Sequence, residues 1–197
     1  MSRIEWAARP CATFCAIETS CTSRRALCQH DSVSSVVTIR AIDDADWPCV
    51  HAIFRDIVAE GETYAYPDTL TSDEAKALWI EGFPGETVVA LVDGVLLGTA
   101  KFGPNRPGRG AHVSTASYMV ATEARGKGIG RALCEFSIAR MKERGFAGMQ
   151  FNAVVSTNVH AIDLYRALGF VTIGTVPGAF ISASQGRVDL VVMYLEF

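Results

Sequence analysis

The chain has 197 residues, of which 49% are hydrophobic and 20% are charged, and its formal net charge at pH 7 is −3. This balance is that of an ordinary globular domain, and it excludes a general electrostatic attraction to nucleic acid or to anionic lipid. No apolar stretch approaches the roughly 20 residues that span a bilayer, and the N-terminus lacks the continuous apolar core of a secretory signal, so we expect a cytoplasmic protein without nucleic-acid or membrane partners.

Residues 1–35 show no sustained periodicity. They contain four of the six cysteines, namely Cys11, Cys15, Cys21 and Cys28. Together with His30 these cysteines raise the alternative of a metal site, but their spacings do not fit a zinc pattern. The composition favours a disordered N-terminal extension. We therefore expect a folded domain over residues 36–197 and no bound metal.

The folded part begins with a β-branched run at residues 36–42, which is typical of a strand. Residues 43–61 predict a helix with an acidic start and a terminal glycine. Its apolar stripe consists of Val50, Ile53, Phe54, Ile57 and Val58. A shorter helix is expected over residues 71–82, opened by a capping signal at Thr71 or Ser72 and closed by a glycine.

Next, two apolar runs flank Asp93-Gly94, the dipeptide that most strongly indicates a two-residue hairpin turn. A flexible loop is expected over residues 104–111. Residues 112–122 then predict a third strand of the same meander. The first half of the chain therefore reads strand, helix, helix and three strands.

After a glycine-rich stretch, a second amphipathic helix is expected to end near Gly145. Its apolar face consists of Ile129, Ala132, Leu133, Phe136 and Ala139. Residues 147–155 predict a strand that is covered on both faces. A third amphipathic helix follows, with Asn158 as its N-cap and Gly169 as its stop. Its stripe consists of Ala161, Leu164, Tyr165 and Leu168.

Two closing strands are expected at residues 171–176 and 188–197. The predicted order is β-α-α-β-β-β-α-β-α-β-β. It indicates an α+β fold with a mixed sheet, in which one strand-helix-strand unit interrupts strands that are joined by hairpins.

The stretch TEARGKGIGRAL, residues 122–133, places glycines at 126, 128 and 130, between a strand and a helix. Glycines bring bare backbone amides close to a ligand, and the helix dipole favours an anion at this end. Arg125, Lys127 and Arg131 add positive charge. A plain glycine-rich turn with solvated basic residues is the alternative, and three glycines at this junction favour a phosphate or pyrophosphate site over it.

Two common phosphate-binding patterns do not fit this stretch. A dinucleotide fold requires G-x-G-x-x-G and an acidic residue at the end of the next strand, whereas the spacing here is G-x-G-x-G and the strand at 149–155 ends without an acid. A P-loop requires G-K followed by Ser or Thr. Neither pattern is present.

The segment RGKGIGRAL resembles the acetyl-coenzyme A signature of the GNAT-type N-acetyltransferases, Q/R-x-x-G-x-G/A, with Arg125, Gly128 and Gly130 at its pattern positions. The segment NVHAIDLYRALGF resembles the second signature of that family. The two lie in the family's order, and the resemblance covers about residues 37–197.

The resemblance implies a mostly antiparallel mixed sheet, flanked by helices and splayed between the strands at 112–120 and 149–155. The pantetheine arm of acetyl-CoA would fill the splay, pair with backbone of residues 119–121 and place its thioester carbonyl on the amide of Val120. The implied coenzyme-binding residues are Met119, Val120, Arg125, Gly126, Lys127, Gly128, Ile129, Gly130, Arg131 and Asn158.

The resemblance also implies direct attack of an amine on the thioester, with Tyr165 as the acid that protonates the departing thiolate. Spacing alone allows Tyr165 to be a core aromatic instead. The resemblance does not identify the general base. A phosphinothricin-acetylating branch of the family carries a glutamate at the position of Thr115, and threonine cannot act as that base. Polar groups that could relay a proton are Glu60, Glu62, His112 and Glu123.

Asn152 matches asparagines of another branch, which acts on proline-analogue amino acids. Left unpaired in an apolar strand, its amide would cost about 1–3 kcal/mol. It therefore either bonds a neighbouring backbone group or faces the splay and holds substrate or an ordered water. The acceptor pocket is expected from segments 61–70, 105–111 and 177–189, with Tyr64 among the residues that shape it.

These features predict an acetyl-CoA-dependent N-acetyltransferase that acts on the amine of a small molecule, such as an amino acid or its analogue. The alternative is a non-catalytic acyl-CoA-binding sensor or partner module with the same fold. Many relatives dimerise, so a homodimer is a further expectation.

Overall fold

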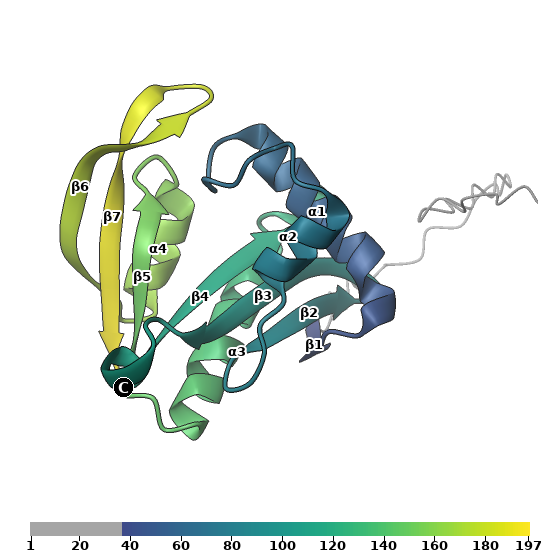
Figure 1. Cartoon of the computed structure of the whole chain (residues 1–197), viewed down its shortest axis with the longest axis horizontal. Coiled ribbons are helices and arrows are strands. Elements are labelled where there is room, and N and C mark those ends of the chain that lie inside the picture. Colours follow the sequence, from purple (N-terminus) through teal and green to yellow (C-terminus); the bar gives the residue numbers. More distant parts are fainter. Residues whose placement is uncertain (1–36) are drawn as a thin grey trace, which may run out of the picture. The chain divides into compact units, whose positions relative to one another are not determined.

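Seven strands form one sheet in the order β1-β2-β3-β4-β5-β7-β6 in the computed structural model, which describes residues 37–197 (Figure 1). Their bounds are β1 Val37–Ala41, β2 Glu86–Val92, β3 Val95–Pro104, β4 Val113–Val120, β5 Gly148–Val155, β6 Val171–Ser182 and β7 Gly186–Glu196. Neighbouring strands are antiparallel except β4 and β5, which are parallel. The predicted α+β class and mixed sheet are confirmed, whereas the N-terminal cysteines and His30 lie outside the described residues.

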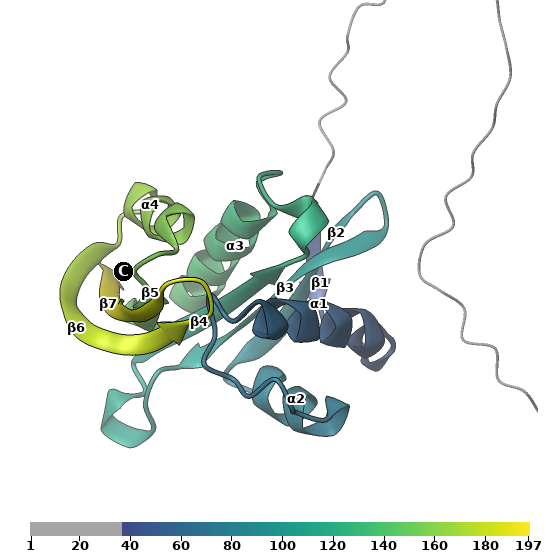
Figure 2. The ribbon, with the colours of Figure 1, turned by 90° about the horizontal axis from the view of Figure 1, so that it is seen from above.

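Helices cover both faces of this sheet. Their bounds are α1 Trp47–Glu60, α2 Ser72–Trp79, α3 Ile129–Glu143 and α4 Val159–Ala167. Figure 2 shows α1 and α2 on one side and α3 and α4 on the other. The order of helices and strands is the predicted one. Within residues 37–197 no helix is long and apolar enough to cross a membrane.

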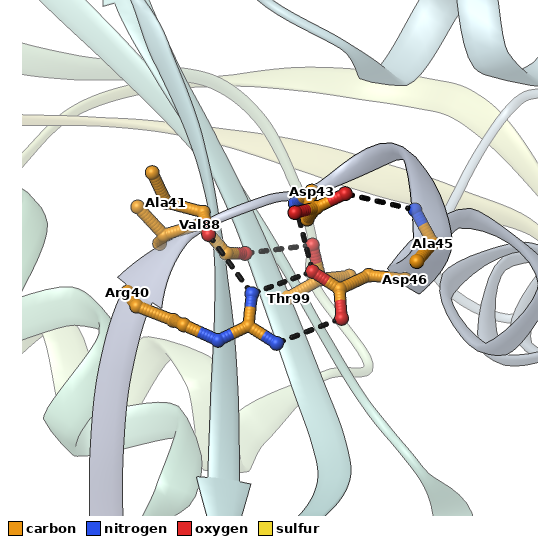
Figure 3. A network of polar contacts seen from close by, with 7 residues as sticks. All are labelled: Arg40, Ala41, Asp43, Ala45, Asp46, Val88 and Thr99. Atoms are coloured by element: carbon orange, nitrogen blue, oxygen red, sulfur yellow. Dashed lines mark hydrogen bonds and ion pairs between the residues drawn. The ribbon is translucent and has the colours of Figure 1, made fainter.

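The start of α1 is held to β1 by a bidentate ion pair (Figure 3). Arg40 donates from both terminal nitrogens to the Asp46 carboxylate, at 2.6 and 2.8 Å. Asp43 caps the turn that precedes the helix, since its side chain accepts from Ala45 N at 3.1 Å and its own amide donates to Asp46 at 2.8 Å. These bonds satisfy amides that have no partner inside the turn.

The predicted stripe of α1 is buried at every position. From α2, the indole of Trp79 is fully buried and donates to Thr99 Oγ1 at 3.0 Å, which satisfies its polar group inside the core. The predicted end of α2 at a glycine is wrong: the helix ends at Trp79 because Ile80 adopts an extended conformation, with ψ of 119°. Its capping box at Thr71 is present.

The buried face of α3 differs from the predicted one. Ala139 is exposed, whereas the helix buries Ile129, Leu133, Cys134, Ser137 and Met141. The buried Ser137 hydroxyl donates to Cys134 O at 2.9 Å and lies 2.6 Å from the Tyr118 hydroxyl. Ser137 is tolerated on the buried face because its hydroxyl is hydrogen-bonded. A prediction from hydrophobic periodicity assigns a serine to the exposed face and therefore misses this position.

The sheet splays between β4 and β5, as predicted. In the described strands, pairing between them is confined to Val113 with Gly148 and Ser114 with Met149. The buried Ser114 hydroxyl reinforces this junction by donating to Gly148 O at 2.9 Å. Beyond it the two strands diverge (Figure 1), which leaves backbone edges of β4 and β5 without a neighbouring strand.

The two closing strands are longer than predicted. β6 extends to Ser182 and β7 begins at Gly186, so the segment expected as a pocket wall consists of hairpin arms and a tight turn. The turn contacts the loop after α1, where Ala183 N donates to Gly61 O at 3.0 Å. This contact joins the loop after α1 to the β6–β7 hairpin, and so connects the two halves of the sheet.

Candidate active site

Two adjoining cavities lie in the splay region. The larger, about 880 Å³, lies beside the glycine-rich stretch. The smaller, about 340 Å³, lies between β4 and β5. Thr63, Asn158 and Ala161 line both. The two cavities therefore adjoin one another beside α4, and the larger also reaches the start of α3.

The larger cavity is built around the N-terminus of α3. Gly126 and Gly128 have φ of 77° and 80°, values that glycine adopts without strain. The amide of Ala132 bonds Gly128 O at 3.0 Å, so the amides of residues 129–131 have no partner further back in the helix. Gly126, Gly128, Ile129, Gly130 and Arg131 all line the cavity. This is the arrangement that binds an anion at a helix N-terminus.

The basic side chains of this stretch contribute less to anion binding than its backbone amides do. Arg125 donates to both oxygens of Glu60, at 2.9 and 2.6 Å, and Arg131 pairs with Glu135 at 3.2 Å. Lys127 is exposed. Because the charge of both arginines is already paired, the attraction for an anion comes chiefly from the backbone amides and the helix dipole.

The edge of β4 that faces the splay is identified by its hydrogen bonds. The Tyr64 hydroxyl donates to Tyr118 O at 2.7 Å and accepts from Tyr118 N at 3.1 Å, so the backbone of Tyr118 faces away from β3. Backbone direction alternates along a strand, and Val120 therefore also faces the splay, where it lines the larger cavity.

The backbone of Met119, which was expected to pair with the pantetheine arm, faces β3 for the same reason. Ala121 N donates to Leu97 O of β3 at 2.9 Å, and Met119, two residues earlier, is paired with Thr99 of that strand. The Met119 side chain is 1% exposed. Neither its backbone nor its side chain is available to a ligand in the splay.

The smaller cavity brings Tyr165 of α4 against β5. Its ring centroid lies 4.4 Å from that of Phe151 and 6.3 Å from that of Tyr118. Burial raises the pKa of Tyr165 well above its ordinary value, as do nearby Cys134 and Tyr64. Within residues 37–197 the hydroxyl has no hydrogen-bond partner, and Tyr165 lines the smaller cavity.

Asn158 stands where the two cavities meet. Its side-chain oxygen accepts from Ala161 N at 3.2 Å, as expected of the N-cap of α4. The predicted stripe of α4 faces the site rather than a closed core: Ala161 and Tyr165 line the smaller cavity and Leu164 lines the larger. The most buried residue of the helix is Ile162.

The carboxylates considered as bases are already bonded. Glu60 holds Arg125 and accepts from Thr122 Oγ1 at 3.0 Å. Glu62 accepts from Ser182 Oγ at 2.6 Å, and these bonds lower its pKa, which makes it a weaker base. Both line the larger cavity. Among the described residues, the lining of the smaller cavity contains no carboxylate, and Thr115 lies there.

The other two polar groups lie elsewhere. His112 precedes β4 at the closed end of the splay, with its Nδ1 3.1 Å from Arg109 O. Glu123 is exposed on the short turn before the glycines. Neither position lies beside Tyr165.

The amide of Asn152 is bonded to side chains and also lines the smaller cavity. Its partners are Asn105, the first residue of the 105–111 segment expected in the acceptor pocket, and Gln150, which was not predicted from the sequence. Gln150 lies two residues from Asn152 and so on the same face of the strand, a spacing that could have identified it. The 105–111 loop reaches the site through Asn105 rather than by lining the cavity.

A family model described as the acetyltransferase (GNAT) family matches residues 47–170. The chain spans about half the length of N-acetyltransferase aca1 of Schizosaccharomyces pombe, with 33% identity over 103 residues, 52% of this chain and 49% of that protein. It spans 13% of protein SPT10 of Saccharomyces cerevisiae, with 40% identity over 83 residues, 42% of this chain. It is 33% identical over 167 residues to the L-methionine sulfoximine/L-methionine sulfone acetyltransferase of Pseudomonas aeruginosa, covering 81% of this chain and 94% of that protein.

Solved structures share the fold. A GCN5-related N-acetyltransferase from Kribbella flavida superposes with a TM-score of 0.80 at 49% identity, covering 82% of this chain and 98% of the other. A GNAT superfamily phosphinothricin acetyltransferase from Sinorhizobium meliloti, in complex with acetyl-CoA, has a TM-score of 0.74 at 28% identity, covering 82% of this chain and 88% of the other.

Proposed function

The chain belongs to the GNAT family of acetyltransferases, and we propose that it transfers the acetyl group of acetyl-CoA to the amine of a small amino-acid-like molecule. The observation that carries this proposal is that the two cavities adjoin, with Thr63, Asn158 and Ala161 lining both. One end offers unbonded amides at a helix N-terminus, and the other offers the Tyr165 hydroxyl. A coenzyme that extends along both cavities would place its pyrophosphate at the amides and its thioester toward Tyr165.

Acetyl-CoA is the acetyl donor. Its pyrophosphate is the anion that the amides of residues 126 and 128–131 would hold. Val120 presents its amide to the splay, where it would donate to the thioester carbonyl and stabilise the negative charge that develops there on attack. Asn158, which lies where the cavities meet, would contact the pantetheine arm.

The reaction requires three proton movements. An aliphatic ammonium, with a pKa near 10, must lose a proton before its nitrogen can attack the carbonyl carbon. The new C–N bond forms as the C–S bond breaks, the nitrogen loses a second proton as it becomes an amide, and the departing thiolate takes a proton. Tyr165 supplies that proton, since it lines the smaller cavity and its hydroxyl has no hydrogen-bond partner within the described residues.

The acceptor is an amino-acid analogue or a molecule of similar size. The smaller cavity, about 340 Å³, is at the lower end of the range for small-molecule sites. The Pseudomonas and Sinorhizobium relatives are named for methionine sulfoximine, methionine sulfone and phosphinothricin, which supports this class of acceptor.

The test measures acetyl-CoA turnover with a panel of amino acids, amino-acid analogues and simple amines, and the release of free thiol reports the turnover. Calorimetry measures acetyl-CoA binding separately. Binding with turnover on at least one small amine supports the proposal. Binding without turnover on any of them would make the chain a coenzyme-binding module, and absence of binding would remove acetyl-CoA as the ligand.

A further inference from the structure

Three carboxamide side chains form a hydrogen-bonded cluster behind the smaller cavity. Asn152 Nδ2 donates to Asn105 Oδ1 at 2.6 Å, and Asn105 Nδ2 donates back to Asn152 Oδ1 at 3.4 Å. Gln150 Nε2 donates to the same Asn152 oxygen at 2.8 Å. The cluster fixes the rotation of the Asn152 carboxamide from two directions.

The backbone holds both ends of this cluster in place. Asn105 N donates to Val113 O at 2.8 Å, which anchors the loop after β3. On β5, the pairing with β7 shifts register between Phe151 and Val154, so Asn152 lies in an irregular segment. Such irregularities re-aim a side chain. The Asn105–Asn152 contact therefore joins the loop after β3 to strand β5, although β4 lies between β3 and β5 in the sheet.

The bonds leave one part of Asn152 unused. Its oxygen accepts two bonds, whereas its Nδ2 has two hydrogens and the contact with Asn105 accounts for one. Of the three amide residues, all within the described part of the chain, Asn152 alone lines the smaller cavity. Asn152 thus lines the cavity with one N–H that no group within the described residues uses.

We propose that this N–H of Asn152 binds an oxygen atom on the non-reacting part of the acceptor, and that Asn105 and Gln150 are positioning residues for it. This inference rests on the proposed function and specifies its acceptor class. The acceptors favoured are small amines that carry a carboxylate, sulfone or amide oxygen. Amines of the same size without such an oxygen leave the Asn152 N–H unpaired and are disfavoured.

The first test compares two matched acceptors, an amino acid and the same amine without its carboxylate. Asn152→Ala, Asn105→Ala and Gln150→Ala are each assayed with both. We expect each variant to raise KM for the amino acid about five- to tenfold, which is the effect of losing one buried hydrogen bond. KM for acetyl-CoA should stay within twofold of wild type, and the carboxylate-free amine should respond little.

The second test separates positioning from a general structural role. If Asn105 acts only through Asn152, then Asn105→Ala should have almost no further effect on KM in the Asn152→Ala background. Arg109→Ala is the control, because it changes an exposed side chain on the same loop. We expect it to behave as wild type.

Several results overturn the inference while leaving the proposed function intact. The first is a wild type that acetylates the amino acid while the variants change its KM by less than twofold. The second is that the effects of Asn105→Ala and Asn152→Ala on KM are additive. The third is that a variant raises KM equally for both acceptors. A wild type that acetylates none of the amines overturns the proposed function, and this inference with it.

Discussion

Glu62 and Ser182 are bonded across the splay although 120 positions separate them in the chain, with Ser182 Oγ donating to Glu62 Oε2 at 2.6 Å. Ser184 N donates to the other carboxylate oxygen at 2.8 Å. These contacts join the loop after α1 to the β6–β7 turn. The splay is thus held at one end by Ser114 and Gly148 and at the other by Glu62 and Ser182.

This relationship predicts a pH-dependent loss of stability in Glu62→Gln. The bonds lower the pKa of Glu62, so its contribution is present above the ordinary pKa of a glutamate and is lost as pH falls through the lowered value. We expect the variant to melt a few degrees below wild type at pH 7, with the difference shrinking toward pH 4. Calorimetry across this range measures it.

The control is Glu123→Gln, which removes the same charge from an exposed residue on the turn before the glycines. It should melt within about a degree of wild type at every pH. A Glu62→Gln variant that also melts like wild type at pH 7, or whose deficit grows at low pH, would contradict the role of these bonds.

Gly128→Asp should abolish most acetyl-CoA binding. A carboxylate there would lie among amides that hold an anion, and repulsion should lower affinity about tenfold or more. Calorimetry with acetyl-CoA measures this loss.

Gly94→Asp is a matched control for that variant. Gly94 has φ of 79° against 80° for Gly128, and a Cβ at either position meets no atom within 4 Å. Both substitutions therefore add the same charge and similar backbone strain, but Gly94 is in the β2–β3 turn. If both variants lose acetyl-CoA equally, strain rather than the anion site accounts for the effect.

Tyr165→Phe should lower kcat by about 10²–10⁴-fold, the usual contribution of a general acid. The ring and its packing against Phe151 are kept, so acetyl-CoA affinity should change little. Steady-state acetyl transfer, with coenzyme binding measured separately, tests this expectation.

Tyr194→Phe is the companion variant, since it removes a phenol from β7 at a residue that lines neither of the two cavities. It should turn over normally. A Tyr165→Phe enzyme within about threefold of wild type, with chemistry rate-limiting, would remove Tyr165 from the mechanism.

We also propose that residues 1–35 are dispensable, since their sequence lacks the periodicity of helices and strands and the family model begins at residue 47. A chain without them should melt within a few degrees of the full chain and bind acetyl-CoA equally. A fall of many degrees would show that this segment contributes to the fold.

The sequence by itself predicted the elements, their order and the glycine turn. These depend on signals that act within a few residues. Asp93 and Gly94 adopt φ of 51° and 79° because their turn requires it, Asn158 caps its helix through Ala161 N, and Gly128 opens the turn before α3. Such local interactions depend on residues that are close together in the sequence.

The tertiary structure decided which of these groups face the site. Val120 and Met119 are neighbouring apolar residues, so their side chains do not distinguish them. Only the pairing of β4 with β3 shows that the backbone of Val120 faces the splay. The contact of Asn105 with Asn152 spans 47 positions. It depends on where two halves of a sheet diverge, which is set by strand order and register. No periodicity or spacing along the chain carries that information, because the partners become neighbours only once the sheet has formed.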